Sequence, residues 1–385
     1  MKHVILTASL SLGLMSLGQT AEAGRWSYLL GVEGWNDENV PAHGVAIIGY
    51  DTPLTAEGNL GVEYNTDTLR LTASGIRIAP RLTFSAGLTG EYGIAGLLPD
   101  YYQGGQTIPE RGFLASYVEA AVGVKHRTAD RLYTELLFQG RKWFFGTNDD
   151  TSDNFTLPEE AWVYRPRLRM TWWHLDNDPG WSARHRLFPR LKGFAIGGEI
   201  GVNLRSDSSS WGAVDPTAFD QTDGRNDANS APIIGRQWMR AGALLGRCWR
   251  VEVQEAAAFG AGEDDLTRDR LGGMNPYVTP LPGAPWASYL SSKYISGMGA
   301  IKRRFMKGAL EAGPVVSAIH LEDPLRMDSG EYDTLYGVGA AVDYRPGNWQ
   351  FDLRGGYSPS VADQSDQAAV SVWFSVGWAS SAEVK

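Results

Sequence analysis

Short segments of alternating apolar and polar residues recur along almost the whole chain after its first twenty or so residues. Successive side chains of a β-strand point to opposite faces, so each such segment has one apolar face and one mixed face. A whole chain built this way predicts a closed antiparallel transmembrane β-barrel whose apolar faces contact lipid. The last segment shows the pattern clearly, with five residues on the predicted lipid side: Val370, Val372, Phe374, Val376 and Trp378.

Sixteen segments follow this rhythm, and most are long enough to cross the apolar layer of a membrane, which takes about nine to eleven tilted residues. An even number of strands places both chain termini in the periplasm. The approximate ranges are 25–33, 43–51, 60–65, 69–78, 82–91, 118–125, 131–145, 161–174, 192–205, 237–246, 249–259, 293–303, 309–321, 336–344, 349–353 and 370–378.

The links between these segments alternate in length. Links after odd-numbered segments are mostly long, and links after even-numbered ones are mostly short, with 175–190 as an exception. Outer-membrane barrels have long external loops and short periplasmic turns, so the links support a barrel. A soluble β-sandwich or propeller does not explain this asymmetry.

The N-terminus has the features of a secretory signal peptide. Lys2 and His3 precede an apolar stretch, and Ala21-Glu22-Ala23 forms a small-residue cleavage site. We therefore expect residues 1–23 to be a signal peptide and residues 24–385 to be a single barrel domain. No later run of about twenty apolar residues predicts a transmembrane helix.

Charge and cysteine content narrow the function classes. The net charge of −9 argues against a nucleic-acid partner, because such proteins present a basic face. The single cysteine, Cys248, excludes an internal disulfide and is expected to be a packing residue. The predicted location is the bacterial outer membrane, where the protein contacts outer-membrane lipid.

One predicted strand carries three arginines on its inward face: Arg165, Arg167 and Arg169. Guanidinium groups facing lipid are costly, so we expect them in the lumen. They form either a charge ladder that hydrates the lumen, a docking site for an inward-folded loop, or a selectivity element. Arginine suits the last two because its planar fork binds carboxylates in a bidentate manner. The candidate carboxylate partners are Glu63, Glu91, Glu119, Glu135 and Glu199.

The sequence shows no strong catalytic, metal or cofactor signature. The six histidines lack His-Glu-x-x-His spacing, and no Gly-x-Ser-x-Gly motif occurs. We therefore predict no catalytic residues, no metal site, no cofactor and no enzymatic activity. An outer-membrane enzyme ranks last among the hypotheses.

The longest external loop contains Asp269-Arg270-Leu271-Gly272-Gly273 and joins the eleventh and twelfth predicted strands. In this it resembles the BamA-like superfamily, also called bacterial surface antigens, whose sixth external loop occupies the same place and folds into the lumen. The matching residues are Arg270, Gly272 and Gly273. No counterpart of the family's Arg-Gly-Phe tip follows them, and no periplasmic POTRA module fits before the first strand. The tail after Trp378 is expected either to weaken the pairing with the first strand or to leave it.

The resemblance implies a barrel in outer-membrane biogenesis or in translocation of protein or lipid. Its cargo would be unfolded polypeptide or lipid, moved past an inward loop and a first–last strand seam. The alternative is a passive porin-type channel for small solutes, with the three arginines opposing lumen acids across an open pore.

Overall fold

The computed structural model describes most of the chain from residue 24 to residue 380. The described ranges are 24–36, 42–55, 58–91, 101–103, 106–108, 112–149, 151–175, 190–213, 225–226, 229–264, 266–273, 280–284, 289–322, 332–362 and 368–380. The expected signal peptide lies outside them. No helix in these ranges is long and apolar enough to cross a membrane.

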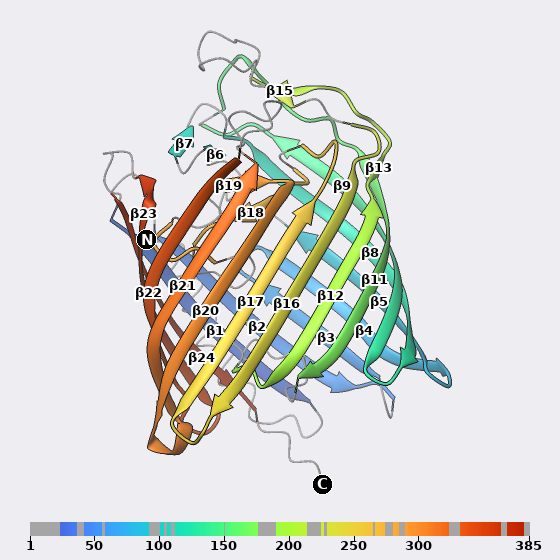
Figure 1. Cartoon of the computed structure of the whole chain (residues 1–385). Coiled ribbons are helices and arrows are strands. Elements are labelled where there is room, and N and C mark those ends of the chain that lie inside the picture. Colours follow the sequence, from blue (N-terminus) through green and yellow to red (C-terminus); the bar gives the residue numbers. More distant parts are fainter. Residues whose placement is uncertain are drawn as a thin grey trace.

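The described strands form a closed antiparallel barrel (Figure 1), which confirms the predicted fold class. Its sheet contains seventeen strands, of which β12 and β13 follow one another along one edge of β11, so the wall has sixteen. The wall strands are β1 (Arg25–Trp35), β2 (His43–Pro53), β3 (Asn59–Asn65), β4 (Thr68–Ala79), β5 (Leu82–Glu91), β8 (Leu114–Ala129), β9 (Leu132–Gly146), β11 (Trp162–Leu175), β12 (Gly193–Val202), β13 (Leu204–Arg205), β16 (Ile233–Leu245), β17 (Trp249–Phe259), β20 (Lys293–Phe305), β21 (Leu310–Glu322), β22 (Tyr332–Tyr344), β23 (Trp349–Ala362) and β24 (Ala368–Ala379).

Short elements occur in the links. Small sheets lie at the end of the barrel that carries the long links (Figure 1), and a 3-10 turn, η1 (Met306–Gly308), joins β20 to β21. Cys248, in the turn between β16 and β17, is exposed, so the expectation of a packing residue was wrong. The short strands are β6 (Tyr101–Gln103), β7 (Gln106–Ile108), β10 (Phe155–Thr156), β14 (Trp211–Ala213), β15 (Arg225–Asn226), β18 (Asp269–Leu271) and β19 (Tyr289–Ser291).

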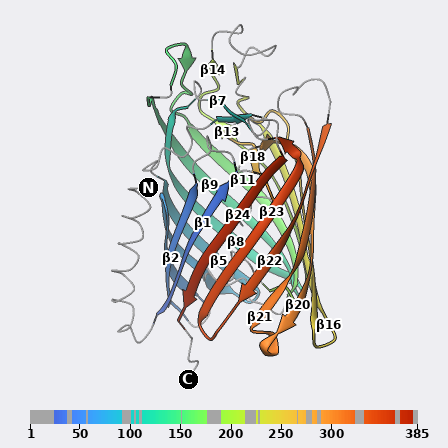
Figure 2. The ribbon, with the colours of Figure 1, turned by 90° about the vertical axis from the view of Figure 1, so that its left-hand side faces the viewer.

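The barrel closes where β1 and β24 lie side by side (Figure 2). Their register runs from Ser27 opposite Ala379 to Trp35 opposite Ser371. The pairing continues into the tail, since the Ser380 amide donates to the Trp26 carbonyl at 2.8 Å. The expected weakening by the tail was therefore wrong as far as Ser380; residues 381–385 lie outside the described ranges.

Burial confirms the two faces of the closing strand. Val372 and Phe374 are 50% and 45% exposed on the outer surface, whereas Trp373 between them is fully buried. The predicted lipid side of β24 is thus its outer face, with Val376 and Trp378 in the same register. An apolar outer face is stable in lipid because the barrel satisfies its own backbone hydrogen bonds.

The interior is filled unevenly. The inward side chains of β24, Ser371 and Ser375, are fully buried. Those of β5, Thr83 and Ser85, are only half-buried. One side of the lumen is therefore packed and the other is accessible to water.

Candidate functional site

The sixth external link, between β17 and β20, turns inward and packs against the barrel wall. Its two arms pair as β18 and β19, and Gly273 forms a bridge with Leu281. Gly272 and Gly273 have φ values of 102° and 83°, a region that side chains with a Cβ rarely adopt. The Gly-Gly pair of the sequence motif therefore shapes this loop.

The far part of the loop buries an apolar face. Leu281 and Ala284 are fully buried, and Leu271 is 1% exposed. Loops on a protein surface seldom bury such residues, so this loop behaves as part of a core. Most wall residues in the same cluster come from β21 to β24, and Ala258 of β17 and Tyr294 of β20 also belong to it; those from β21 to β24 are Ile319, Leu321, Leu335, Val361 and Ala369.

Hydrogen bonds hold the far part of the loop to the inner wall. The Gly283 amide donates to the Ser371 Oγ of β24 at 3.0 Å. Trp35 Nε1 of β1 donates to the Ala284 carbonyl at 3.1 Å. On β21, the Ser317 hydroxyl donates to the Pro280 carbonyl at 2.7 Å. The loop thus reaches both strands of the closing seam.

An ion pair anchors the near arm of the loop to the opposite part of the wall. Arg205 Nη1 and Nη2 donate to the two oxygens of Asp264 at 2.7 and 2.6 Å. Trp211 Nε1 adds a third donor at 3.1 Å. Burial alone would raise the pKa of Asp264, but these hydrogen bonds and the Arg205 charge hold it below its ordinary value.

Arg236 of β16 forms a second anchor. Its guanidinium contacts Glu263 at 3.0 Å and Asp269 at 2.5 Å. Asp269 also accepts a hydrogen bond from the Tyr294 hydroxyl at 3.0 Å. Burial raises the pKa of Glu263 to about 7, although the neighbouring Arg236 favours the charged form.

The predicted ladder side chains meet on the inner wall of β8, β9, β11 and β12. Arg169 contacts Glu199 at 2.7 Å and Glu135 at 3.3 Å. Arg167, whose side chain is 4% exposed, contacts Glu199 at 3.4 Å and Asn203 at 3.1 Å. The structure thus brings Arg167 and Arg169 together with two of the candidate carboxylates.

Arg165 pairs with Glu119 at 3.2 Å in a neighbouring group. Glu119 also accepts from Arg141 at 2.8 Å and from Gln139 at 2.9 Å. The sequence reasoning missed Arg141. The same alternation contained the signal, because Arg141 is six residues after Glu135 and shares its face.

The other two predicted carboxylates lie apart from the three arginines. Glu63 of β3 is 3.7 Å from Arg70 of β4. Glu91 ends β5, opposite Tyr117 of β8. Arg270, on β18, pairs in register with Leu290 of β19, and its neighbour Asp269 forms an ion pair with Arg236.

A buried charge cluster at the periplasmic end was not anticipated from the sequence. Lys302 contacts Glu252 at 3.0 Å and Asp343 at 2.7 Å. Beside them, Glu311 accepts from Arg250 at 2.9 Å and from Arg304 at 3.1 Å. These residues lie on β17, β20, β21 and β22, and β23 adds Arg354, which is 3.7 Å from Asp343.

The end of the long periplasmic link, just before β12, lies across this cluster. Arg190 donates to the carbonyls of Gly308 at 2.6 Å and Ala309 at 3.0 Å, in the turn between β20 and β21. The Leu191 amide donates to Glu252 at 2.9 Å, and Leu191 is 1% exposed. These contacts cover part of the lumen from the periplasmic side.

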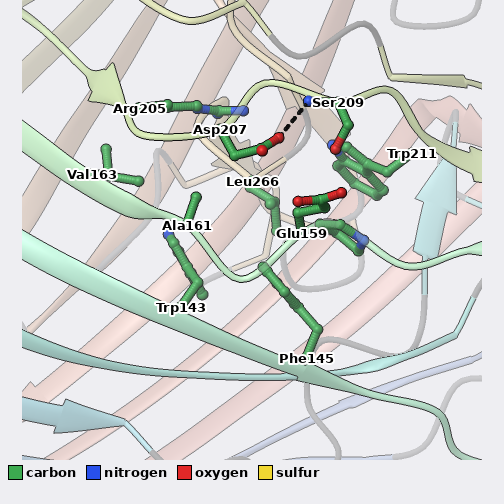
Figure 3. Close-up of a pocket in the computed structure, with 11 residues that line it drawn as sticks. Trp143, Phe145, Glu159, Ala161, Val163, Arg205, Asp207, Ser209, Trp211 and Leu266 are labelled. Carbon is green, nitrogen blue, oxygen red and sulfur yellow. Dashed lines mark hydrogen bonds between the residues drawn. The ribbon is translucent and has the colours of Figure 1, made fainter.

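A small pocket opens among the external links (Figure 3). Trp143, Trp211 and Leu266 form its apolar lining, and Glu159 and Asp207 stand at its polar side. The Ser209 amide donates to Asp207 at 2.9 Å, and such hydrogen bonds lower the pKa of Asp207. Trp211 packs edge-on against Phe113 and Phe155, and Trp143 stacks on Phe145, so these rings cap the outer end of β8 to β11.

Solved structures with the same fold include outer-membrane barrels of the BamA type. Neither a protein-family model nor a curated protein matches the sequence. BamA from Haemophilus ducreyi lacking POTRA domains 1–3 superimposes with a TM-score of 0.60 at 11% identity, over 94% of this chain and 71% of that one. CdiB from Acinetobacter baumannii gives 0.53 at 12%, over 94% and 61%. CdiB from Escherichia coli gives 0.54 at 10%, over 92% and 63%.

These likenesses concern the fold. This chain spans about three fifths of the length of the two CdiB chains. Its architecture is that of a bacterial outer-membrane β-barrel and resembles the BamA and CdiB barrels.

Proposed function

We propose that this barrel acts in outer-membrane biogenesis or in translocation of protein or lipid. In this proposal the sixth external loop occupies the lumen and does not line an open pore. The observation that carries the proposal is the course of this loop through the lumen. It is held by Asp264 on Arg205 at one side and by Gly283 on Ser371 at the other.

Such a loop spans the space that a porin leaves open. Its apolar face is buried against β21 to β24, so removing it from the lumen would expose Leu271, Leu281 and Ala284 to water. The periplasmic contacts of Arg190 and Leu191 add a partial cover at the other end. A barrel filled in this way is better suited to moving cargo along its wall than to letting small solutes diffuse through its centre.

Conductance in planar bilayers tests this proposal. We expect the wild-type protein to give no steady large conductance, and Asp264→Ala combined with Arg236→Gln to give larger and more frequent openings. The matched control is Asp130→Ala, an exposed acid in a periplasmic turn. A large, steady wild-type conductance equal to that of the double variant would contradict the plugged barrel.

A passive channel for small solutes is the second candidate. The half-buried inner face of β5, with Thr83, Ser85 and Thr89, favours it because these side chains meet water. The same recordings separate the candidates, since charge reversal at Arg167 should change ion selectivity only if the arginine ladder lines an open path.

A further inference from the structure

A carboxylate and an amide lie side by side on the lipid-facing surface of the barrel, on the part of the wall nearest the viewer in Figure 1. Gln237 Nε2 of β16 donates to Glu255 Oε1 of β17 at 2.9 Å. Their outward direction follows from the strand period, because Val253 and Phe259 of β17 are 41% and 56% exposed. On the inward face of the same strand, Glu252 is buried.

The pair lies within the apolar band of the wall. Glu255 stands between two outward aromatic residues of β17, Trp249 at the periplasmic end and Phe259 at the external end. At about 3.3 Å per residue, these rings are roughly 20 and 13 Å away along the strand. Aromatic residues mark the two borders of the apolar band of an outer-membrane barrel. The carboxyl group of Glu255 is therefore surrounded by hydrocarbon unless another molecule covers it.

No basic residue in the described part of the chain neutralises Glu255, which forms no ion pair there. Its cross-strand partners are Met239 of β16 and Gly297 of β20. The outward basic residues of β20, Lys293 and Arg303, are at or near the two ends of that strand. A carboxyl group in lipid without a cation beside it is costly, and ionisable residues in such a setting mark functional contacts.

The surface around the pair is low, so another protein can approach it closely. Small residues lie opposite both polar side chains: Gly198 and Ala257 flank Gln237, and Gly297 lies beside Glu255. A Cβ on Gly297 would meet nothing within 4 Å. Small residues let membrane-embedded segments pack closely, and polar side chains among them form hydrogen bonds across the interface.

A second copy of this chain does not present the missing charge at this depth. Copies inserted in one membrane share their depth and orientation, so the cation would have to face outward at the level of Glu255. Among the described strand residues that face outward, the lysines and arginines lie toward the strand ends; they are Lys142, Lys293 and Arg303. Lys142 and Lys293 also have acidic partners of their own. The charge therefore has to come from a different molecule.

We propose that the outer face of β16, β17 and β20 docks a different membrane-embedded protein, which presents a lysine or arginine to Glu255 within the apolar band. The partner's cation supplies the charge that Glu255 lacks, and the second N–H of Gln237 donates to an acceptor of the partner. The hydrophobic effect does not drive two protein surfaces together in lipid, so this ion pair and hydrogen bond give the contact its specificity. The contact lies on the outer wall and is independent of what the lumen carries.

Energy transfer in phospholipid vesicles tests this surface with a defined probe. The full barrel carries a donor dye on Cys248, its single cysteine, which is exposed in the turn between β16 and β17. The probe is a synthetic transmembrane helix of about 20 leucine and alanine residues with one central lysine and an acceptor dye; the matched probe has a central methionine. We expect the lysine probe to bind about tenfold more tightly than the methionine probe. Glu255→Gln should remove this preference, and Val122→Ala, on the lipid face of β8, should leave it unchanged.

Equal binding of the two probes to the wild-type barrel would overturn the proposal, as would a lysine preference that survives Glu255→Gln. A photoreactive amino acid in place of Gly297 then reports the contact in intact outer membranes. The expected result is an adduct with another membrane protein that Glu255→Gln abolishes. An adduct with a second copy of this chain alone, or no adduct, would overturn the proposal. Migration of unheated samples in gels confirms that each variant is folded.

Discussion

The two sides of the lumen use the same alternating strands to build opposite interiors. On the wall from β21 to β24 and β1, inward side chains are fully buried: Ser371 contacts the sixth loop, and Trp373 packs in a cluster with Leu29 and Ile47. On the wall from β4 to β9, inward side chains such as Thr83 and Ser85 remain half-buried. The alternation of apolar and polar residues therefore predicts which face of a strand a side chain lies on. Whether an inward side chain is buried depends on what packs against it inside the lumen.

Glycine positions show the difference at atomic scale. A Cβ on Gly356 of the packed wall would lie 2.5 Å from the Gly283 amide nitrogen, and one on Gly337 would lie 2.2 Å from the Pro282 carbonyl oxygen. A Cβ on Gly87 of the solvated wall would meet nothing closer than 3.4 Å. The packed wall thus needs glycine so that the loop backbone can approach it.

The largest expected effect comes from removing the loop's ionic anchor. Arg205→Gln leaves Asp264, which is 1% exposed, without its bidentate partner, and a buried charge that loses its partner costs about 3–5 kcal/mol. Arg70→Gln on the solvated wall removes a 3.7 Å contact of a side chain that is 38% exposed, and should cost below about 1 kcal/mol. Urea unfolding in detergent, followed by tryptophan fluorescence, measures both losses. Equal losses of unfolding free energy in the two variants would contradict the difference between the packed and the solvated wall.

A smaller effect on stability is expected when a glycine on each wall is replaced by valine. Gly356→Val forces the loop away from β23, at a cost of about 1–3 kcal/mol for overpacking, and should raise the frequency of channel openings. Gly87→Val on β5 is the matched control and should change neither stability nor conductance appreciably. If both valines behaved alike, the loop would not press on the packed wall.

The contribution of Glu263, in the sixth loop, to the free energy of unfolding should depend on pH. Because its pKa is raised in the folded protein from 4.5 to about 7, folding favours the protonated form, and the unfolded chain releases the proton first as pH rises. Its contribution is fully present below pH 4.5 and is lost as pH rises toward 7, by roughly 1–3 kcal/mol. Unfolding measured across this range should show stability falling with pH, and Glu263→Gln should remove that fall. A slope unchanged in the variant would contradict this assignment.

The barrel was predictable because its signal repeats along the chain. Strands such as β5 and β24 alternate without interruption, and their links sort by length. The two-residue β10 and the three-residue β14 carry no such period and were missed. The tail was misjudged because the amide and the hydroxyl of Ser380 both bond to the Trp26 backbone, and the alternating pattern does not signal such contacts.

The candidate site was predictable only where it followed the same period. Arg165, Arg167 and Arg169 stand at alternate positions on one strand, so their shared face was evident. Arg205 and Asp264 are 59 residues apart, and nothing local marks them as partners. Their contact depends on the loop's course, which tertiary packing sets.

Crosslinking the sixth loop to the packed wall tests the central claim most directly. In a Cys248→Ser background, Pro280→Cys and Ser317→Cys replace residues joined by a 2.7 Å hydrogen bond, and a short thiol crosslinker should join them in intact outer membranes. Pro280→Cys with Ser85→Cys, on the solvated wall, should remain unlinked. Efficient linkage of the first pair alone is the result expected of a loop packed on β21. Failure of that pair, or equal linkage of both, would contradict a loop held against one wall of the lumen.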